Sequence, residues 1–406
     1  MTVSAGGCPV RKLVPPDERG GPPVERIGGP DGERWVFRSF ELVRSVLREE
    51  SAFHQAGFGA DGLRRASMRP PILYLEGPAH RAQRRAAARL FTPKITEGYR
   101  PMVEDLAERL VGRLRSDRAT DLTTLSLRMA VEVAARVVGL TNSSIPAMTR
   151  RLDTFFDGDP LASRWTPRTT IKLLRTHSAT FRFYWLDVKP AIRARRRHPD
   201  RTDDVISQLV ERDFTDLEIL TECLTYGAAG MVTTREFITV AAWHLLDDPA
   251  LLARFRAGDR QDRLAIVNEA LRLEPVVGHL LRRTDRTVTL PGPDGPIAVA
   301  AGDLVDLDIR AANTDAATIG EAPLELRPDR SLPRAVPATV LSFGDGNHRC
   351  PGAPIAIMET EIFLSSLFAR DVVATGPPRV RWNPVTLGYD LDQFDLRLAP
   401  PETSQV

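Results

Sequence analysis

Residues 342–352 read Ser-Phe-Gly-Asp-Gly-Asn-His-Arg-Cys-Pro-Gly, and this stretch decides how the rest of the 406-residue chain is interpreted. It places Cys350 at the end of a loop, just before a helix-like run from Ala353 to Ala369. The positive end of a helix lowers the pKa of a nearby thiol and favours its charged form. Gly344 and Gly346 permit a tight turn that comes close to a bulky group. The stretch therefore predicts a charged thiolate, with a buried free cysteine near a helix start as the alternative.

The same stretch resembles the haem-ligand loop of the cytochromes P450, whose pattern is Phe-Gly-x-Gly-x-His-x-Cys-x-Gly, and every fixed position is present. The resemblance covers the chain from Ser39 to its end. It implies a mainly α cytochrome P450 fold with a small β region and a single domain over residues 1–406. Haem b would lie between the long central helix and the cysteine loop with its following helix. Cys350 would be the proximal thiolate ligand of the iron, which favours cleavage of an oxygen–oxygen bond.

A helix is predicted from Pro78 to Phe91, because proline is favoured at the first position of a helix. His80 and Arg84 are four residues apart and share one face of it. A solvated basic face is the ordinary interpretation, but the segment resembles the one in which a histidine and an arginine of P450s bind the haem propionates. Buried carboxylates need charge-assisted donors of this kind. The resemblance implies these further haem-binding residues, with Arg283 as the alternative to its neighbour Arg282: Arg282, His348, Phe343, Gly344, Ala229 and Gly230.

A long, mostly apolar helix is predicted to begin at the capping box Thr215–Glu218. Small residues at its centre would let a flat cofactor approach the backbone, or would let another helix pack closely. Family members usually have Ala-Gly-x-acid-Thr there, whereas this chain has Val232 at the acid position and keeps Thr233. The resemblance implies catalytic roles for Thr233 and Thr234, with protons supplied through water, Thr234, Glu236 or the substrate.

A helix predicted from Arg263 to Leu273 contains Glu269 and Arg272, whose spacing puts the two charges together. The spacing alone is a weak signal in so charged a chain. Its position resembles the Glu-x-x-Arg pair of P450s, with Arg330 as the third charged partner. A bidentate pair of this kind could pin the helix to the cysteine loop.

The resemblance also implies a substrate pocket across the haem from the cysteine. Its walls would come from residues 58–73, from lid helices at 145–156 and 169–197, from the central helix, and from residues 276–281 and 386–389. Six side chains are predicted to line it: Met231, Val232, Val277, His279, Leu387 and Tyr389. Tyr389 and His279 are candidate polar handles for a substrate, and His279 is equally well interpreted as a histidine with a structural partner.

Pro351 follows the cysteine and has no N–H to donate to the sulfur. Fewer hydrogen bonds make the thiolate a stronger donor and lower the reduction potential of the iron. We therefore expect a lower potential than in a Pro351→Leu variant. Proline also suits the start of a helix, and both roles can hold together.

The composition argues against several other classes of protein. The chain has 55 basic and 53 acidic residues, so its net charge gives no reason to expect a nucleic acid partner. Three widely spaced cysteines do not suggest a disulfide framework and fit a reducing compartment. The sequence has no signal-peptide pattern and no run of about eighteen apolar residues that would anchor it in a membrane. We expect a soluble, cytoplasmic protein of bacterial type.

The other segments are predicted in outline. Residues 1–33 and 312–338 are expected to be irregular, and residues 51–71 to form a long loop. A helix capped by Ser39 is expected to run to Glu50. Further helices are predicted at 102–114 and 122–140, and short strands at 287–290, 297–299, 304–307 and within 380–398.

Together these features predict a haem-thiolate monooxygenase that uses O2 to oxidise a small or medium-sized organic substrate in secondary metabolism. Electrons would come from a separate ferredoxin and ferredoxin reductase. The missing acid at Val232 makes a peroxide-driven or oxidative-coupling P450 an alternative. A non-catalytic haem-binding sensor is a second alternative, against which the predicted lid and Thr233 argue.

Overall fold

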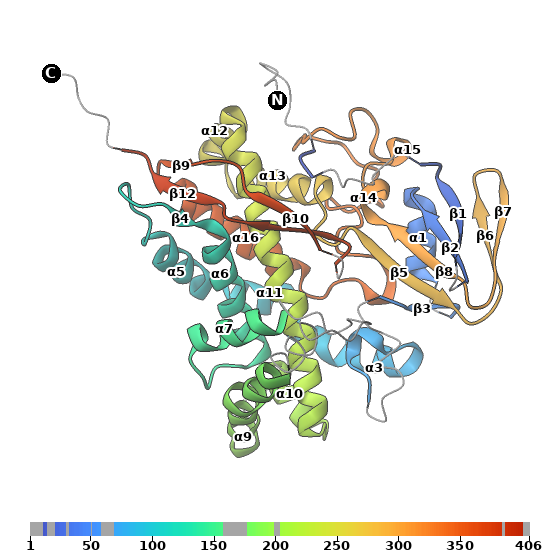
Figure 1. The fold of residues 1–406 in the computed structure, drawn as a ribbon, viewed down its shortest axis with the longest axis horizontal. Helices are drawn as coiled ribbons and strands as arrows, with labels where there is room; N and C mark the ends of the chain where they lie inside the picture. Colours follow the sequence, from blue (N-terminus) through green and yellow to red (C-terminus); the bar gives the residue numbers. More distant parts are fainter. Residues whose placement is uncertain are drawn as a thin grey trace, which may run out of the picture. The chain divides into compact units, whose positions relative to one another are not determined.

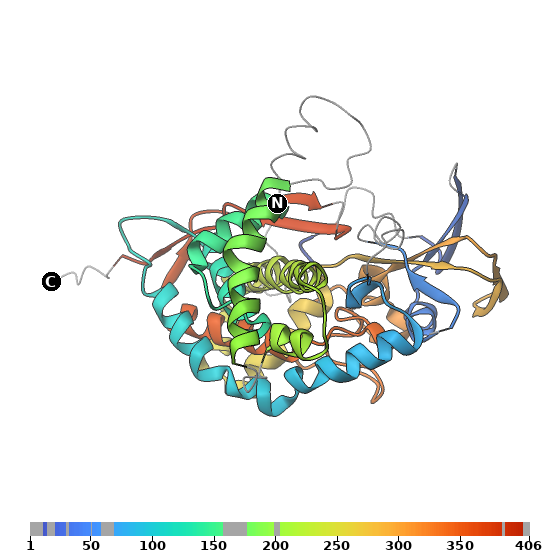
Figure 2. The same cartoon turned by 90° about the horizontal axis from the view of Figure 1, so that it is seen from below.

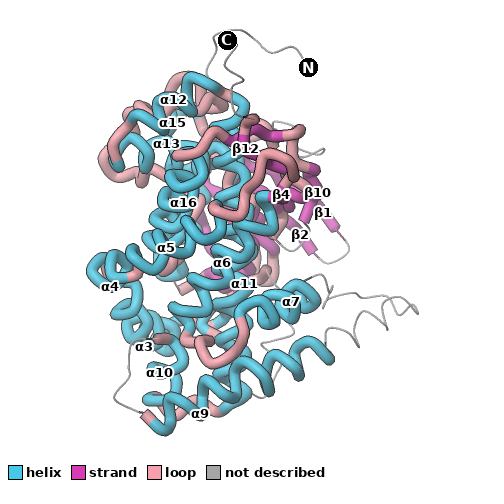
Figure 3. The backbone as a smooth tube through the Cα atoms, turned by 90° about the vertical axis from the view of Figure 1, so that its left-hand side faces the viewer, coloured by secondary structure: helices cyan, strands magenta, loops and turns pink. Residues whose placement is uncertain are grey.

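The computed structural model describes residues 11–13, 21–29, 32–49, 51–57, 69–156, 177–198, 204–383 and 386–400. These residues are mainly helical with a small β region, as the sequence predicts (Figure 3). The chain divides into two compact units: unit 1 is Met1–Ala60, Arg100–Ser126 and Glu236–Val406, and unit 2 is Asp61–Tyr99 and Leu127–Arg235. The single domain predicted from the sequence stays a prediction. None of the helices in the described part of the chain is long and apolar enough to cross a membrane.

Unit 1 contains a five-stranded sheet in the order β1-β2-β8-β5-β3 (Figure 1). The strands are β1 (Val24–Gly29), β2 (Gly32–Phe37), β8 (Leu304–Asp308), β5 (His279–Thr284) and β3 (Phe53–Gln55). β2 runs parallel to β8, and the other neighbouring pairs are antiparallel. Apolar side chains of this sheet and of α1 (Phe40–Arg48) form one buried core.

The other described strands of unit 1 form three small sheets. They are β6 (Val288–Gly292) with β7 (Gly295–Val299), β10 (Arg379–Asn383) with β11 (Gly388–Asp392), and β4 (Thr120–Asp121) with β12 (Asp395–Leu398) and β9 (Val372–Ala374). The helices are α5 (Arg100–Val111), α12 (Pro249–Ala257), α13 (Arg260–Leu273), α14 (Ile309–Ala312), α15 (Ala316–Ile319), α16 (Ala353–Phe368) and the short η4 (Gly346–His348). α16 is apolar on most sides and packs against α5 and α13, as expected for a buried helix.

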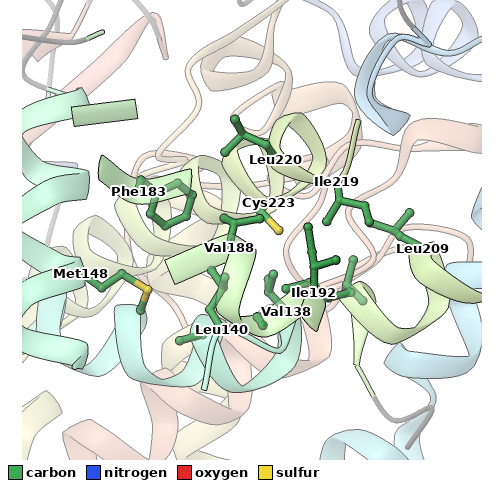
Figure 4. Packing of buried hydrophobic residues seen from close by; sticks show 14 of the residues in the cluster. Val138, Leu140, Met148, Phe183, Val188, Ile192, Leu209, Ile219, Leu220 and Cys223 are labelled. Atoms are coloured by element: carbon green, nitrogen blue, oxygen red, sulfur yellow. The ribbon is translucent and has the colours of Figure 1, made fainter. Parts of the chain in front are cut away.

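Unit 2 is helical in its described part. Its elements are η1 (Ile72–Tyr74), α3 (Gly77–Ala88), η2 (Arg89–Phe91), α4 (Pro93–Gly98), α7 (Ile145–Phe156), the π-helix η3 (Tyr184–Val188), α9 (Lys189–Arg197) and α10 (Val205–Glu211). α6 (Leu122–Val138) begins in unit 1 and continues in unit 2. The core of unit 2 gathers around Cys223, Val188 and Ile192 (Figure 4).

α11 (Asp216–Asp247) passes from unit 2 into unit 1; it is seen from the side in Figure 1 and close to end-on in Figure 2. The predicted capping box is confirmed. The Thr215 amide donates to Glu218 Oε2 at 2.8 Å, and the Glu218 amide donates back to Thr215 Oγ1 at 3.3 Å. Both bonds satisfy backbone N–H groups near the helix start that have no acceptor inside the helix.

Local predictions are wrong where a remote partner decides the structure. Residues 24–29 form β1 instead of irregular chain, because their backbone pairs with β2. Their side chains are mostly exposed or half-buried, so burial gave no signal for a strand. β3 interrupts the predicted loop 51–71, because it pairs with β5. The short helix α15 likewise interrupts residues 312–338, which are predicted to be irregular. Ser39 precedes α1 but its side chain does not cap the helix; the Phe40 amide donates to Asp315 Oδ2 at 2.9 Å instead.

Candidate functional site

The cysteine loop, residues 342–352, is closed by its own backbone. The Cys350 amide donates to the Phe343 carbonyl at 2.8 Å, and the Gly344 amide donates to the Leu341 carbonyl at 2.8 Å. Gly344 has a φ of +69°, a left-handed conformation that glycine adopts without strain. The turn predicted from the glycines is therefore present, and it fixes the backbone on which the cysteine sits.

The loop is also held against α1. Gly346 has a φ of +65°, and a side chain there would place its Cβ 2.2 Å from the Leu47 carbonyl oxygen. The bulky neighbour that requires this glycine is thus the backbone of α1. Asp345 accepts hydrogen bonds from Arg44 at 3.0 Å and from Arg48 at 2.9 Å. Partial burial would raise the pKa of Asp345. The hydrogen bonds from the Gly346 amide and the two arginines outweigh this effect, so the pKa is lowered. Asp345 was not identified from the sequence.

The two described cysteines differ in exposure. Cys350 is exposed, whereas Cys223 is buried in the core of unit 2 and burial raises the pKa of its thiol. Cys8 lies outside the described residues. α16 begins at Ala353, so Cys350 lies at the positive end of a 16-residue helix. Of the two described cysteines, Cys350 has the surroundings that suit a thiolate ligand.

The predicted ion pair on α13 is present and buried. Arg272 donates to both carboxylate oxygens of Glu269, from Nε at 2.7 Å and from Nη2 at 2.8 Å. Arg330 Nε donates to Glu269 Oε1 at 2.9 Å. Arg272 is fully buried, so the paired carboxylate of Glu269 offsets the cost of removing the guanidinium charge from water.

The connection from this ion pair to the cysteine loop runs through Asn313, a residue that the sequence did not single out. Arg272 Nη1 donates to the Asn313 carbonyl at 2.9 Å. The Asn313 side chain donates to Ser342 Oγ at 2.8 Å and accepts from the Leu341 amide at 2.9 Å. Ser342 Oγ donates in turn to the Leu271 carbonyl at 2.9 Å. Asn313 is fully buried, so it joins α13 to the start of the loop away from water.

Two segments predicted to line the pocket, residues 276–281 and 386–389, touch through glycines in unit 1. A Cβ on Gly278 would lie 2.3 Å from the Leu387 carbonyl oxygen, and a Cβ on Gly388 would lie 2.1 Å from the Val276 carbonyl oxygen. Leu387 has a φ of +46°, which is strained for a residue with a side chain. The predicted lining residues Val277 and Leu387 therefore belong to adjoining backbone segments.

The two predicted polar handles have structural partners. His279 Nδ1 lies 2.9 Å from Asp306 Oδ1. Burial alone would lower the pKa of His279, but Asp306 outweighs it and raises that pKa. Tyr389 is 2% exposed and donates its hydroxyl hydrogen bond to the Glu274 carbonyl at 2.9 Å. Tyr389 as a handle for substrate stays a prediction, and its hydroxyl hydrogen is engaged with this carbonyl.

Arg282, which the sequence predicts as a binding residue, is buried on β5. Arg282 donates to the side chain of Gln55, on β3, and to the Leu281 carbonyl at 3.0 Å. Its neighbour Arg283 donates to the Gly302 carbonyl at 2.6 Å. His348 is half-buried in η4. Gln55 orients Arg282 from a strand that the sequence did not predict.

In unit 2, α3 separates an inward face from a solvated one. His80 is 2% exposed and Arg84 is half-buried, whereas Arg81 and Arg85 are exposed. Burial raises the pKa of Tyr226 on α11, and the charge of Arg84 opposes that rise, so the two side chains are near each other. The predicted pair therefore lies on the protein-facing side of α3.

The centre of α11 carries the predicted catalytic hydroxyls. Thr233 Oγ1 donates to the carbonyl of Ala229, one turn earlier. Thr234 is buried, and Val232 is half-buried. Glu236, one of the suggested proton donors, is fully buried and accepts a hydrogen bond from the Leu391 amide at 2.8 Å. Its carboxylate therefore has a structural task in unit 1.

Helix packing accounts for two other residues of this region. Met231 is 1% exposed and belongs to the core of unit 2, and its role as a pocket residue stays a prediction. A Cβ on Gly230 would lie 3.7 Å from Ala134 Cβ on α6, which favours the interpretation of close helix packing. Ala229 is exposed. Residues 58–68 of the predicted pocket loop and 157–176 of the predicted lid lie outside the described residues.

Comparison with known proteins connects the chain to one family. The family model described as Cytochrome P450 matches residues 264–376, which contain most of α13 and the whole cysteine loop. The cyclomarin C epoxidase CymV of Salinispora arenicola is 29% identical over 75% of this chain and 74% of its own length. The mycinamicin IV hydroxylase/epoxidase of Micromonospora griseorubida is 28% identical over 89% of each chain. The solved structure of cytochrome P450 CYP109Q5 from Chondromyces apiculatus is 26% identical, with a TM-score of 0.74 and coverage of 93% of this chain and 92% of that one.

Proposed function

The chain belongs to the cytochrome P450 family, and on that premise we propose that Cys350 is the iron ligand of a haem-thiolate monooxygenase. Proteins of this family bind haem, and the chain is an oxidoreductase of the monooxygenase type. When bound, haem would supply the activation of oxygen. Electron density from a thiolate ligand favours cleavage of the oxygen–oxygen bond. The observation that carries the proposal is the exposed residue Cys350, three residues before the start of α16, on a loop fixed by its own backbone.

The residues present fit this cofactor. A soft, accessible sulfur suits iron, and the haem propionates are carboxylates that need charged donors. We assign that task to His80 and Arg84 on the inward side of α3 and to Arg282 and His348 in unit 1. Phe343, Gly344 and the exposed Ala229 would contact the ring, and Gly230 is the weaker candidate because it packs against α6.

On α11 the proposed catalytic hydroxyls are those of Thr233 and Thr234. The Thr233 hydroxyl bonds to its own helix at rest, and a rotation of its side chain would release it to hold a proton for the reaction. Val232 cannot supply that proton, and Glu236 is engaged with the Leu391 amide. We infer that protons arrive through water or from the substrate itself.

We further propose that O2 is the oxidant, that a ferredoxin and its reductase supply electrons, and that the substrate is a small or medium-sized natural product. The relatives named for cyclomarin C epoxidation and mycinamicin IV oxidation support a role in bacterial secondary metabolism. A peroxide-driven or oxidative-coupling reaction is the second candidate, because Val232 occupies the acid position. A haem sensor without turnover is the third.

The ferrous–CO spectrum tests the ligand, and turnover tests the reaction. The wild-type protein should show the shifted Soret band of a thiolate complex, Cys350→Ala should lose it, and Cys223→Ala should keep it. A Cys350→Ala protein with an unchanged spectrum would overturn the assignment. Product formation with a ferredoxin pair supports the first candidate, and product formation with peroxide alone supports the second. If no product forms under either condition, the result supports the sensor.

For the oxygen side, Thr233→Ala should increase the release of unproductive peroxide per electron consumed. Unchanged coupling would remove Thr233 from the proton path.

A further inference from the structure

Glu222 is a buried acid on α11 that the proposed reaction does not use. It is 1% exposed and lies in unit 2 beside the core residue Cys223. Burial raises its pKa to about 7, although the Ile72 amide, Gln83 and Arg69 act in the opposite direction. A buried carboxyl is costly, so its contacts deserve a physical explanation.

One oxygen of this carboxyl connects three elements. Glu222 Oε1 accepts a hydrogen bond from the Ile72 amide at 2.9 Å and a second from Gln83 Nε2 at 2.5 Å. Ile72 begins η1 and Gln83 belongs to α3. The other oxygen, Oε2, is buried without a hydrogen-bond partner in the described part of the chain. The carboxyl therefore holds η1 and α3 to α11 through a single atom.

The elements joined in this way carry residues of the proposed site. Gln83 precedes Arg84 and lies three residues after His80, on the buried side of α3. Ile72 lies at the end of the predicted pocket loop. Thr233 lies eleven residues after Glu222, which is close to three full turns and puts both residues on one side of α11.

A second contact supports the same arrangement. Tyr226, one turn after Glu222, stacks on Phe91 of η2 with ring centroids 6.4 Å apart and an interplanar angle of 9°. This contact restrains the far end of the α3–η2 segment, while Glu222 restrains its middle. The stack of Tyr226 on Phe91 keeps η2 against α11. The hydrogen bond between Gln83 and Glu222 restricts the position of α3 along α11 more closely, because hydrogen bonds depend on distance and angle.

We propose that Glu222 is a positioning residue, which through Gln83 and Ile72 sets where α3 holds His80 and Arg84. The inference rests on the proposed function, because haem propionates give those two side chains their task. Removal of the acceptor would leave the Ile72 amide and the Gln83 amide group buried without partners. α3 would then shift to regain hydrogen bonds, and the propionate donors would shift with it.

The test compares Glu222→Leu with Glu222→Gln in the haem-loaded protein. Leucine removes the acceptor, and glutamine keeps a carbonyl oxygen in the same place. We expect haem transfer to apomyoglobin to be roughly tenfold faster for Glu222→Leu and within about twofold of wild type for Glu222→Gln, as for the loss of a buried hydrogen-bond acceptor. Gln83→Leu should reproduce the fast loss, and the double variant should be no worse than either single variant.

Cys223→Ala is the matched control, because it removes a buried group from the next position of α11 without touching this contact. Suppose that Cys223→Ala and Glu222→Leu lose the same unfolding free energy and also lose haem at the same increased rate. Haem loss would then follow overall stability, and the proposal would be overturned. Amide hydrogen exchange along α3 gives a readout that does not depend on haem chemistry. It should increase in Glu222→Leu and Gln83→Leu only.

Unchanged exchange and unchanged haem loss in Glu222→Leu would also overturn the inference. The wild-type CO spectrum reports separately on the proposed function, so the two failures are distinguishable.

Discussion

Replacing Glu359 with methionine should stabilise the protein at alkaline pH. Glu359 lies on α16, nine residues after Cys350, and is 3% exposed. Its Oε1 has no hydrogen-bond partner among the described residues, and burial raises its pKa from 4.5 to about 8. The unfolded chain loses this proton above pH 4.5, whereas the folded protein keeps it up to about pH 8. Stability therefore falls as the pH rises through this window and is constant above it.

The size of the effect follows from the shift. Each unit of pKa difference corresponds to about 1.4 kcal/mol, so this one carboxyl removes roughly 5 kcal/mol of unfolding free energy above pH 8. Methionine has a similar length and no titrating group, and it should recover most of that amount at about pH 9 while changing little at about pH 5. Glu222, with a pKa raised from 4.5 to about 7, titrates partly in the same window, so the unfolding free energy of the variant should still fall by roughly 3 kcal/mol in total between pH 4.5 and pH 7.

Urea unfolding of the haem-loaded protein at a series of pH values measures this directly. Glu361→Met is the matched control, two residues further along the same helix and 2% exposed. Glu361 accepts from Arg263 at 2.8 Å and from Ser365 at 3.1 Å, so its loss should destabilise the protein. A Glu359→Met protein that kept the full wild-type slope up to pH 8, or was less stable than wild type at about pH 9, would refute the reasoning.

The remaining predictions concern the cysteine loop and its supports. Gly346→Ala should cost at least about 2 kcal/mol of unfolding free energy in urea, because the left-handed φ and the contact with Leu47 both oppose a side chain; an effect below about 0.5 kcal/mol would contradict it. Asn313→Ala should cost roughly 3 kcal/mol and speed the loss of the thiolate–CO spectrum on storage, since several buried groups lose their partners; an unchanged spectrum and stability would contradict it. Glu269→Ala should cost roughly 3–5 kcal/mol by leaving Arg272 buried and unpaired, and a loss as small as that of an exposed ion pair would contradict it. Pro351→Leu should raise the reduction potential measured by spectroelectrochemistry, and an equal or lower potential would contradict it.

Sequence reasoning located the parts of this site that local patterns specify. The cysteine loop, the capping box of α11 and the pair of Glu269 with Arg272 each depend on residues a few positions apart, so their spacing carries the information. The third partner, Arg330, came from the family resemblance, because nothing local connects it to Glu269. Its hydrogen bond at 2.9 Å is present in the structure.

The residues that were missed have partners far along the chain. Asn313 bonds to Ser342, Asp345 to Arg44 and Arg48, and Glu222 to Gln83. A single asparagine, aspartate or glutamate in a sequence has no pattern that distinguishes a buried connecting residue from a solvated one. The same holds for the apolar surroundings of Met231 and for the carbonyl that accepts from Tyr389, since both are set by tertiary packing.

The proposed iron ligand in unit 1 and the proposed catalytic hydroxyl in unit 2 differ in how completely the chain specifies them. Cys350 is positioned by a hydrogen bond within its loop, by the contacts of Gly346 and Asp345 with α1, and by the link from Asn313 to the start of the loop. The cysteine loop is thus held from within, from α1 and from Asn313. On α11, in contrast, Thr233 bonds to its own helix and Val232 has no proton to give. A ligand must stay in place, whereas proton delivery can be completed by water or by a substrate. For this reason the cysteine loop predicts the cofactor, and measurements on Thr233 and on the substrate have to determine the reaction.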